Sequence, residues 1–96
     1  MSETEVCLKI SGRVQRVGFR RWAVSQAQNI GGIDGYVCNI NDGSVLIYMR
    51  ADEEKMLQYI QKIYQGPFLA RVDQVENMPQ NKKLFPPIES GVFKKI

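Results

Sequence analysis

The first third of the chain changes from a two-residue to a helical hydrophobic period. Every second position in residues 5–11 is aliphatic, which predicts a strand with one buried face. After a glycine-bounded loop at 12–18, apolar residues recur at steps of four, four and three, which is typical of the buried stripe of a helix. Gly31 and Gly32 then favour a helix end, because glycine readily adopts the positive φ found there. The predicted stripe consists of Phe19, Ala23, Ala27 and Ile30.

The middle of the chain predicts a hairpin followed by a second helix. Residues 33–40 and 44–50 are rich in β-forming residues and flank Asn41-Asp42-Gly43, and an Asp-Gly turn between two such runs predicts a hairpin. Asp52 is suited to cap a helix, and the two acidic residues after it favour the positive end of the helix dipole. Gly66-Pro67 ends that helix. Its predicted apolar face comprises Leu57, Ile60, Ile63 and Tyr64, with Met56 beside it.

The last third completes a recognisable order of elements. Residues 71–78 predict a fourth strand, 79–90 with three prolines an irregular connection, and 91–96 a short fifth strand. The order strand, helix, strand, strand, helix, strand predicts a ferredoxin-like α+β two-layer sandwich, with two helices on an antiparallel sheet and the first two strands separated by the third. We expect one domain over residues 1–96, with residues 1–4 flexible. This fold hosts many activities, so it does not settle the function.

Composition and charge narrow the class of protein. Ninety-six residues suffice for one hydrophobic core but not for two. No apolar run approaches the roughly 20 residues needed to cross a bilayer, and the polar, acidic N-terminus does not resemble a signal or transit peptide. We therefore expect a cytoplasmic protein with no membrane partner. The net charge of +3 permits an anionic partner without requiring one.

The cysteine and histidine counts exclude several kinds of active site. The chain has no histidine, which excludes Ser-His and Cys-His nucleophile pairs and any histidine-ligated metal site. Cys7 and Cys38 are the only thiols, and their spacing fits no zinc or redox motif. A disulfide between them is one interpretation, and a reduced pair in a cytosolic protein is the one we prefer.

A run of basic residues surrounds the loop at 12–18. No carboxylate lies between Glu5 and Asp34, so the run could contact phosphate or a larger polyanion such as nucleic acid. The loop joins a strand to a helix start, where free N–H groups and successive loop amides form a concave site for an anion. Gly12 and Gly18 would allow a tight turn and a close approach to a ligand. The alternative interpretation is a basic loop that is exposed to solvent and binds no anion. The basic residues are Lys9, Arg13, Arg16, Arg20 and Arg21.

From Val6 to Ile96 the chain resembles the acylphosphatases. GRVQRVGFR at 12–20 agrees at eight of nine positions with the family's first motif, Gly-Arg-Val-Gln-Gly-Val-Gly-Phe-Arg. GYVCN at 35–39, followed by NDGSV at 41–45, matches the second motif, Gly-Trp-Val-x-Asn before an Asp-Gly turn, with Tyr36 in place of tryptophan. GPFLARVDQVE at 66–76 extends the resemblance.

The resemblance implies an enzyme that hydrolyses the carboxyl-phosphate bond of small acyl phosphates to a carboxylate and inorganic phosphate. It implies that Arg20 binds the phosphate and that Asn39 positions the attacking water. It also implies no metal, no other cofactor and no covalent phosphoenzyme. We further expect inorganic phosphate to inhibit and the protein to be a monomer. The phosphate-binding loop implied by the first motif comprises Gln15, Arg16, Val17, Gly18, Phe19 and Arg20.

Three positions depart from the family pattern. Arg16 replaces a glycine, so its side chain either strains the loop, points into the site as a second cation, or bends away into solvent. The connection at 29–35 is one residue longer, and we expect the glycine turn to absorb it, because a register shift would turn Asn39 to the wrong face. Ala51 stands where the family often has glycine, and we expect little effect from it.

Other interpretations of these residues remain open at this point. Asn39, just before a turn, could satisfy only local backbone groups. The chain could be a non-catalytic phosphate-binding relative or an RNA-binding ferredoxin-like domain, although no aromatic sheet motif of an RNA-recognition domain is present. We interpret Trp22 and Tyr36 as packing residues, and Lys82-Lys83 and Lys94-Lys95 as solvated surface.

Overall fold

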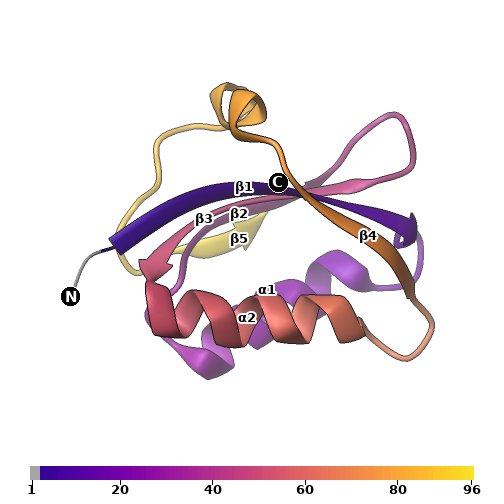
Figure 1. The fold of residues 1–96 in the computed structure, drawn as a ribbon, viewed down its shortest axis with the longest axis horizontal. Helices are drawn as coiled ribbons and strands as arrows, with labels where there is room; N and C mark the ends of the chain where they lie inside the picture. Colours follow the sequence, from indigo (N-terminus) through magenta and orange to yellow (C-terminus); the bar gives the residue numbers. More distant parts are fainter. Residues whose placement is uncertain (1–2) are drawn as a thin grey trace.

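The computed structural model describes residues 3–96 and contains two helices on one face of a five-stranded sheet (Figure 1). The strand order β4-β1-β3-β2-β5 places β3 between β1 and β2, as the sequence predicted. The predicted ferredoxin-like α+β sandwich is therefore confirmed. The elements are β1 (Glu3–Arg13), α1 (Phe19–Ile30), β2 (Asp34–Asn39), β3 (Val45–Asp52), α2 (Glu53–Gln65), β4 (Arg71–Asn77), the 3₁₀ helix η1 (Pro79–Leu84) and β5 (Phe93–Lys95).

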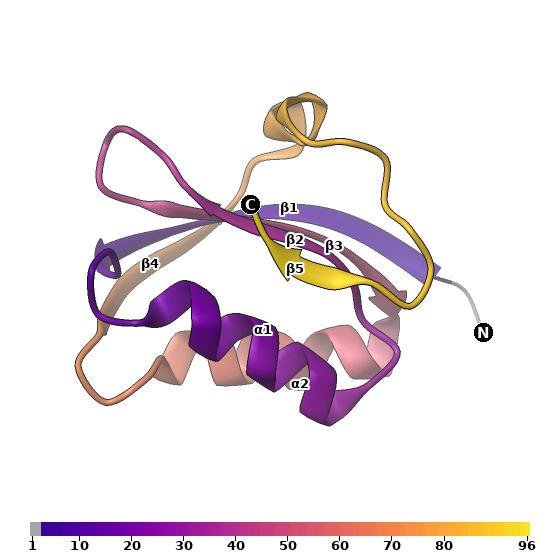
Figure 2. The same ribbon diagram turned by 180° about the vertical axis from the view of Figure 1, so that it is seen from behind.

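The sheet differs from the prediction at both ends of the chain. β5 pairs with β2 in parallel, so the sheet is mixed rather than wholly antiparallel, because residues 78–92 cross the back of the sheet and return the chain in the direction of β2 (Figure 2). β1 begins at Glu3 rather than residue 5, since Glu3 pairs with Asp52 and Thr4 with Ala51. The flexible segment predicted at 1–4 thus includes two paired residues, and residues 1–2 lie outside the described part of the chain.

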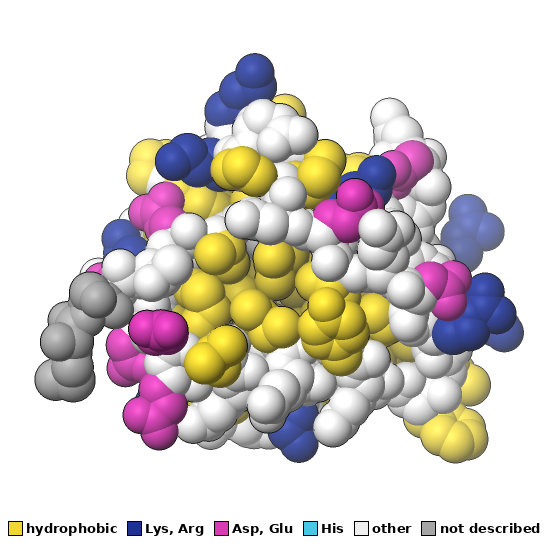
Figure 3. All heavy atoms as spheres, in the orientation of Figure 1, with side chains coloured by type: hydrophobic (Ala, Val, Ile, Leu, Met, Phe, Trp, Pro, Cys, Tyr) yellow, Lys and Arg dark blue, Asp and Glu magenta, His cyan; other side chains and the backbone are white. Residues whose placement is uncertain are grey.

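The main core lies between the sheet and the helices, and α2 presents a different face to it from the one predicted. Its buried residues are Met56, Tyr59 and Ile63, whereas Leu57 and Tyr64 are 56 % and 57 % exposed. The Tyr59 hydroxyl donates to the Ala23 carbonyl at 2.8 Å, and this bond allows a tyrosine to be fully buried. Figure 3 shows hydrophobic side chains at the surface between α2 and the sheet.

The back face of the sheet carries a smaller apolar cluster. Cys7, Tyr36 and Tyr48 are buried there against Phe85, which follows η1. The Tyr36 hydroxyl donates to the Pro87 carbonyl at 2.7 Å, so Tyr36 is a packing residue as predicted. Both Cys7 and Cys38 are free thiols, and they lie on β1 and β2, which β3 separates. Within residues 3–96 no helix is long and apolar enough to span a membrane.

Candidate active site

The loop before α1 is held between two buried side chains. Val14 and Phe19 are each only 1 % exposed and fix the two ends of the loop in the core. Gly18 adopts φ 77°, in the left-handed region that favours glycine, and its carbonyl accepts the first helical hydrogen bond from Trp22 N–H at 3.0 Å. A β-carbon at Gly18 would meet open space, so backbone conformation rather than crowding selects glycine here. The loop therefore brings the start of α1 to the surface of the molecule, where the backbone of Gly18 is exposed.

The first turn of α1 keeps its N–H groups free of side-chain partners. Among the described residues no side chain caps this helix, and its first turn holds no acidic residue. Arg20 and Arg21 occupy the first turn instead. Uncapped N–H groups carry the positive end of the helix dipole, so this end of α1 is suited to hold an anion.

Asn39 and Lys95 lie on neighbouring strands above this helix end. β2 alternates between the two faces of the sheet, so Asn39 shares the helix-facing side with Val37, which is fully buried. β5 continues the same face, because Lys95 pairs in parallel with Val37 and Phe93 is buried against the helices. The register therefore aims Asn39 toward α1, as predicted, and Gly31 and Gly32 turn the chain between α1 and β2 with φ of 79° and 74°.

A cavity of about 170 Å³ joins these three segments. Of the residues predicted for the site, all line this cavity except Gln15 and Val17. Val17 packs against the hydrophobic core, so its side chain serves the fold rather than the cavity. The lining residues are Val14, Arg16, Gly18, Phe19, Arg20, Arg21, Asn39 and Lys95.

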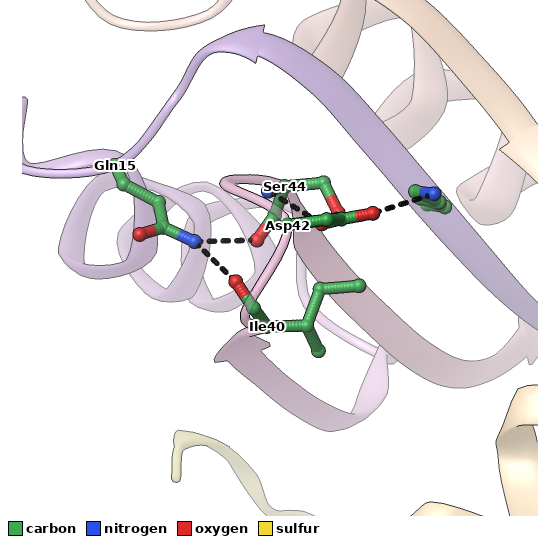
Figure 4. A network of polar contacts seen from close by, with 5 residues as sticks. Gln15, Ile40, Asp42 and Ser44 are labelled. Carbon is green, nitrogen blue, oxygen red and sulfur yellow. Dashed lines mark hydrogen bonds and ion pairs between the residues drawn. The ribbon is translucent and has the colours of Figure 1, made fainter.

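Gln15 has a structural task that the sequence did not reveal. Its side-chain amide donates to the Ile40 carbonyl at 2.8 Å and to the Ser44 carbonyl at 2.9 Å (Figure 4). Both carbonyls belong to the hairpin loop that directly follows Asn39. Gln15 thus ties the loop before α1 to the strand end that carries Asn39, and it fixes the distance between the two halves of the cavity.

Arg16 shows the backbone strain that one of the three interpretations predicts. Its φ is 63°, so it occupies the left-handed region that the corresponding glycine would adopt without strain. Arg16 is exposed, and it is also one of the residues that line the cavity. The loop is therefore strained at a residue that lies at the edge of the cavity.

The charges around the cavity are uncompensated. Within residues 3–96 none of the four lining cations forms an ion pair, and no lining residue is acidic. Asp42 of the nearby hairpin is engaged elsewhere, because Lys9 at 2.8 Å and Ser44 hold the pKa of its carboxyl well below its usual range. Burial raises the pKa of the Cys38 thiol, and the guanidinium of Arg20 partly opposes that rise. The cavity thus has a positive potential with no internal counter-ion.

The structure gives two residues, Lys95 and Gly12, a different place from the one that the sequence suggested. Lys95 was interpreted as solvated surface; it is exposed, and it also lines the cavity. The alternation of β5 could have indicated this, since a residue two positions after a buried aromatic shares its face. Gly12 does not line the cavity. It lies at a bulge where a β-carbon would collide with the backbone of Arg71 and Asp73, so it serves strand pairing.

Throughout the described chain, no group of three or more acidic or thiol side chains could hold a metal ion.

Several known proteins are similar to this chain in sequence or in fold. The Acylphosphatase family model matches residues 6–85. An acylphosphatase of Thermococcus kodakarensis is 42 % identical over 76 residues, which cover 79 % of this chain and 82 % of that protein. An acylphosphatase of Nitrobacter winogradskyi is 39 % identical over 79 residues, covering 82 % of this chain and 79 % of its own length. In fold, the chain is similar to the solved acylphosphatase of Coxiella burnetii, with a TM-score of 0.81 at 22 % identity over 98 % of this chain and 93 % of that one.

Proposed function

Because the chain belongs to the acylphosphatase family and is a hydrolase with acylphosphatase activity, we propose that the cavity between α1 and β2 is its active site. One observation carries this proposal. A single cavity is lined by an arginine in an uncapped first helical turn and by an amide side chain on the facing strand. In this proposal, an anion bound by the arginine and a water molecule held by the amide meet inside this cavity.

Arg20 and the amides at the start of α1 bind the phosphoryl group in this proposal. A guanidinium forms two parallel hydrogen bonds with phosphate oxygens, and the free N–H groups of the loop and helix supply further donors. Such donors stabilise the charge that spreads over the equatorial oxygens in the transition state. Arg16 adds a second positive charge at the same cavity.

Asn39 holds the attacking water in line with the acyl leaving group. An amide is too weak a base to deprotonate water at neutral pH, so a phosphate oxygen of the substrate accepts the proton. The water oxygen forms a bond to phosphorus, and the bond between phosphorus and the acyl oxygen breaks with its electron pair. The products are a carboxylate and inorganic phosphate. Because a carboxylate is already a good leaving group, positioning and charge stabilisation suffice, and no histidine is needed.

The proposal includes catalysis without a metal and by a monomer. A metal would normally neutralise phosphate charge, and here Arg20 and Arg16 perform that task. The same charge explains why phosphate itself should remain bound as product or inhibitor. A cytoplasmic location and the absence of nucleic-acid partners remain part of the proposal.

The experiment that tests the proposed function is hydrolysis of acetyl phosphate and of benzoyl phosphate by the purified protein, with and without a chelator. We expect both to be hydrolysed at rates that the chelator leaves unchanged. Inorganic phosphate should inhibit competitively, because it occupies the site of the phosphoryl group. Loss of activity with the chelator and its return with a divalent metal would contradict the metal-free mechanism, and non-competitive inhibition would contradict the proposed site.

A further inference from the structure

A second hollow continues the cavity along the groove between α1 and β5. Its volume is about 350 Å³, and two of its lining residues, Arg21 and Lys95, also line the cavity formed by Arg20 and Asn39. Figure 2 shows β5 running alongside α1 at this side of the molecule. The two hollows therefore meet at a rim formed by two cations, and a molecule bound by its phosphoryl group can extend past them into the groove.

We propose, resting on the function proposed above, that this groove binds the acyl group of the substrate and that Lys95 and Arg21 select acyl groups bearing a second anion, a carboxylate. The favoured substrate class is thus the mono-acyl phosphate of a short dicarboxylic acid. Lys95 is a specificity-determining residue in this view, and hydrolysis of the phosphoryl bond itself remains the task of Arg20 and Asn39.

The lining of the groove fits such an acyl group. Val24 of α1 and Phe93 of β5 supply apolar surface for the methylene groups of an acyl chain, and Ser25 and Gln28 supply polar atoms beside it. Among the described residues, the lining of the groove includes no aspartate or glutamate. A carboxylate would therefore meet positive charge at the rim and no opposing negative charge in the groove.

The number of cations supports a substrate with more than one anionic group. Arg20 and the backbone amides satisfy a phosphoryl group, and Arg16 already adds a further charge on the loop side. Lys95 lies on the side of the cavity opposite the loop, because its parallel pairing with Val37 directs it to the helix-facing surface of the sheet. Its neighbour Lys94 also lines the groove, and its ammonium lies 6.0 Å from the centroid of the Tyr36 ring in the back-face cluster. Lys95 and Arg21 are thus cations of the rim without an assigned task in phosphate binding.

The test compares succinyl phosphate with butanoyl phosphate, which has the same chain length and no carboxylate. The quantity measured is the ratio of their kcat/KM values, so any general effect of a substitution on hydrolysis cancels. We expect the wild-type ratio to exceed one, and Lys95→Gln to lower it about threefold, as for one solvent-accessible ion pair. Lys95→Glu should lower it further. Lys83→Gln on η1 removes the same charge far from the groove and should leave the ratio unchanged.

The outcomes separate this inference from the proposed function. If wild type hydrolyses both substrates and Lys95→Gln leaves the ratio unchanged, or changes it no more than Lys83→Gln does, the inference is overturned and the proposed function stands. If wild type hydrolyses neither substrate, the proposed function fails. The groove is then tested by calorimetry with 5-phosphonopentanoate and pentylphosphonate. Tighter binding of the carboxylate-bearing phosphonate, lost in Lys95→Gln, supports the groove, and equal affinities overturn it.

Discussion

The two helices of this molecule begin in opposite ways. α2 begins at Asp52, whose carboxylate accepts a hydrogen bond from Lys55 N–H at 2.9 Å, and two glutamates follow in its first turn. α1 begins at Gly18 in the left-handed conformation, without a side-chain cap among the described residues and with arginines in its first turn. One helix supplies the negative charge that its N-terminus attracts, and the other lacks it.

The difference teaches where stability and function lie in this fold. The cap and acidic first turn of α2 each contribute roughly 0.5–1 kcal/mol to folding, as expected for a helix whose start has no other task. At α1 the same contributions are forgone, and cations next to the dipole add repulsion. A bound anion would relieve both costs, so the start of α1 is suited to an anionic ligand.

The largest expected effect comes from the first turn of α1. Arg20→Gln should lower kcat/KM for benzoyl phosphate about a thousandfold and weaken inhibition by phosphate, because the guanidinium contacts the phosphoryl group in both ground and transition states. Steady-state kinetics measure both quantities. Arg71→Gln on β4 is the matched control and should retain wild-type kinetics. Equal kinetics of the two variants would show that α1 holds no phosphate.

Asn39→Ala should lower kcat about a hundredfold while the inhibition constant of phosphate stays close to wild type, because Asn39 contacts only the water. The measurement is kcat together with phosphate inhibition. Circular dichroism must first show that the variant is folded. Full turnover by folded Asn39→Ala would show that Asn39 only satisfies backbone groups of the turn and does not position the water.

Inorganic phosphate should stabilise the protein through α1 alone. At a hundredfold excess over its dissociation constant it should add about 2.7 kcal/mol to the free energy of unfolding, because it binds only the folded state. Denaturant titrations with phosphate, and with chloride at equal ionic strength, measure this. The gain should persist in Asp52→Ala and disappear in Arg20→Gln. A gain that survives in Arg20→Gln would place the phosphate elsewhere.

Asp52→Ala should affect stability without affecting the site. Loss of the cap of α2 should cost about 1 kcal/mol, which lowers the melting temperature by roughly 4–8 °C in a domain of this size. Its kcat and KM should equal those of wild type, because α2 contributes no residue to the cavity. Asp52→Asn, which can still cap, should recover most of the melting temperature.

Arg16→Gly should have the smallest effect, with two parts of different origin. Relief of the positive φ outweighs the added freedom of the unfolded chain, so the melting temperature should rise by a few degrees, for a gain of about 0.5 kcal/mol. Removal of a lining cation should weaken phosphate inhibition a few-fold. Arg16→Lys keeps the charge and the strain, and it should change neither quantity much. Higher melting with unchanged inhibition would mean that Arg16 only strains the loop.

The sequence predicted α1 well and α2 less well for a physical reason. The stripe of α1 is flanked by polar residues, so only one face can be buried. In α2, apolar residues lie on two overlapping stripes, and the prediction took the stripe with Tyr64 rather than the one with Tyr59. Burial of a tyrosine is costly unless its hydroxyl has a partner. The Ala23 carbonyl on the other helix supplies that partner, and such a tertiary contact is not readable from local periodicity.

The parts of the candidate site formed by neighbouring residues could be predicted from the sequence. The parts formed where distant segments meet could not. The glycine in the left-handed conformation and the arginine after it follow from the loop sequence. The Gln15 bonds to the hairpin and the arrival of Lys95 beside α1 depend on strand order and on the parallel pairing of β5. No spacing along the chain encodes those distances, so only the folded sheet reveals them.

The order of strands also has a kinetic consequence. β1 is the first strand made, yet its partners come much later, since Ile10 pairs with both Val45 and Val75. Such pairings between remote segments slow folding, because a large loop closes before any contact compensates its lost entropy. The cavity needs residues from the loop before α1, the end of β2 and β5 at the same time. During refolding, helical circular dichroism should therefore recover before hydrolysis does, and enzymatic activity marks completion of the whole sheet.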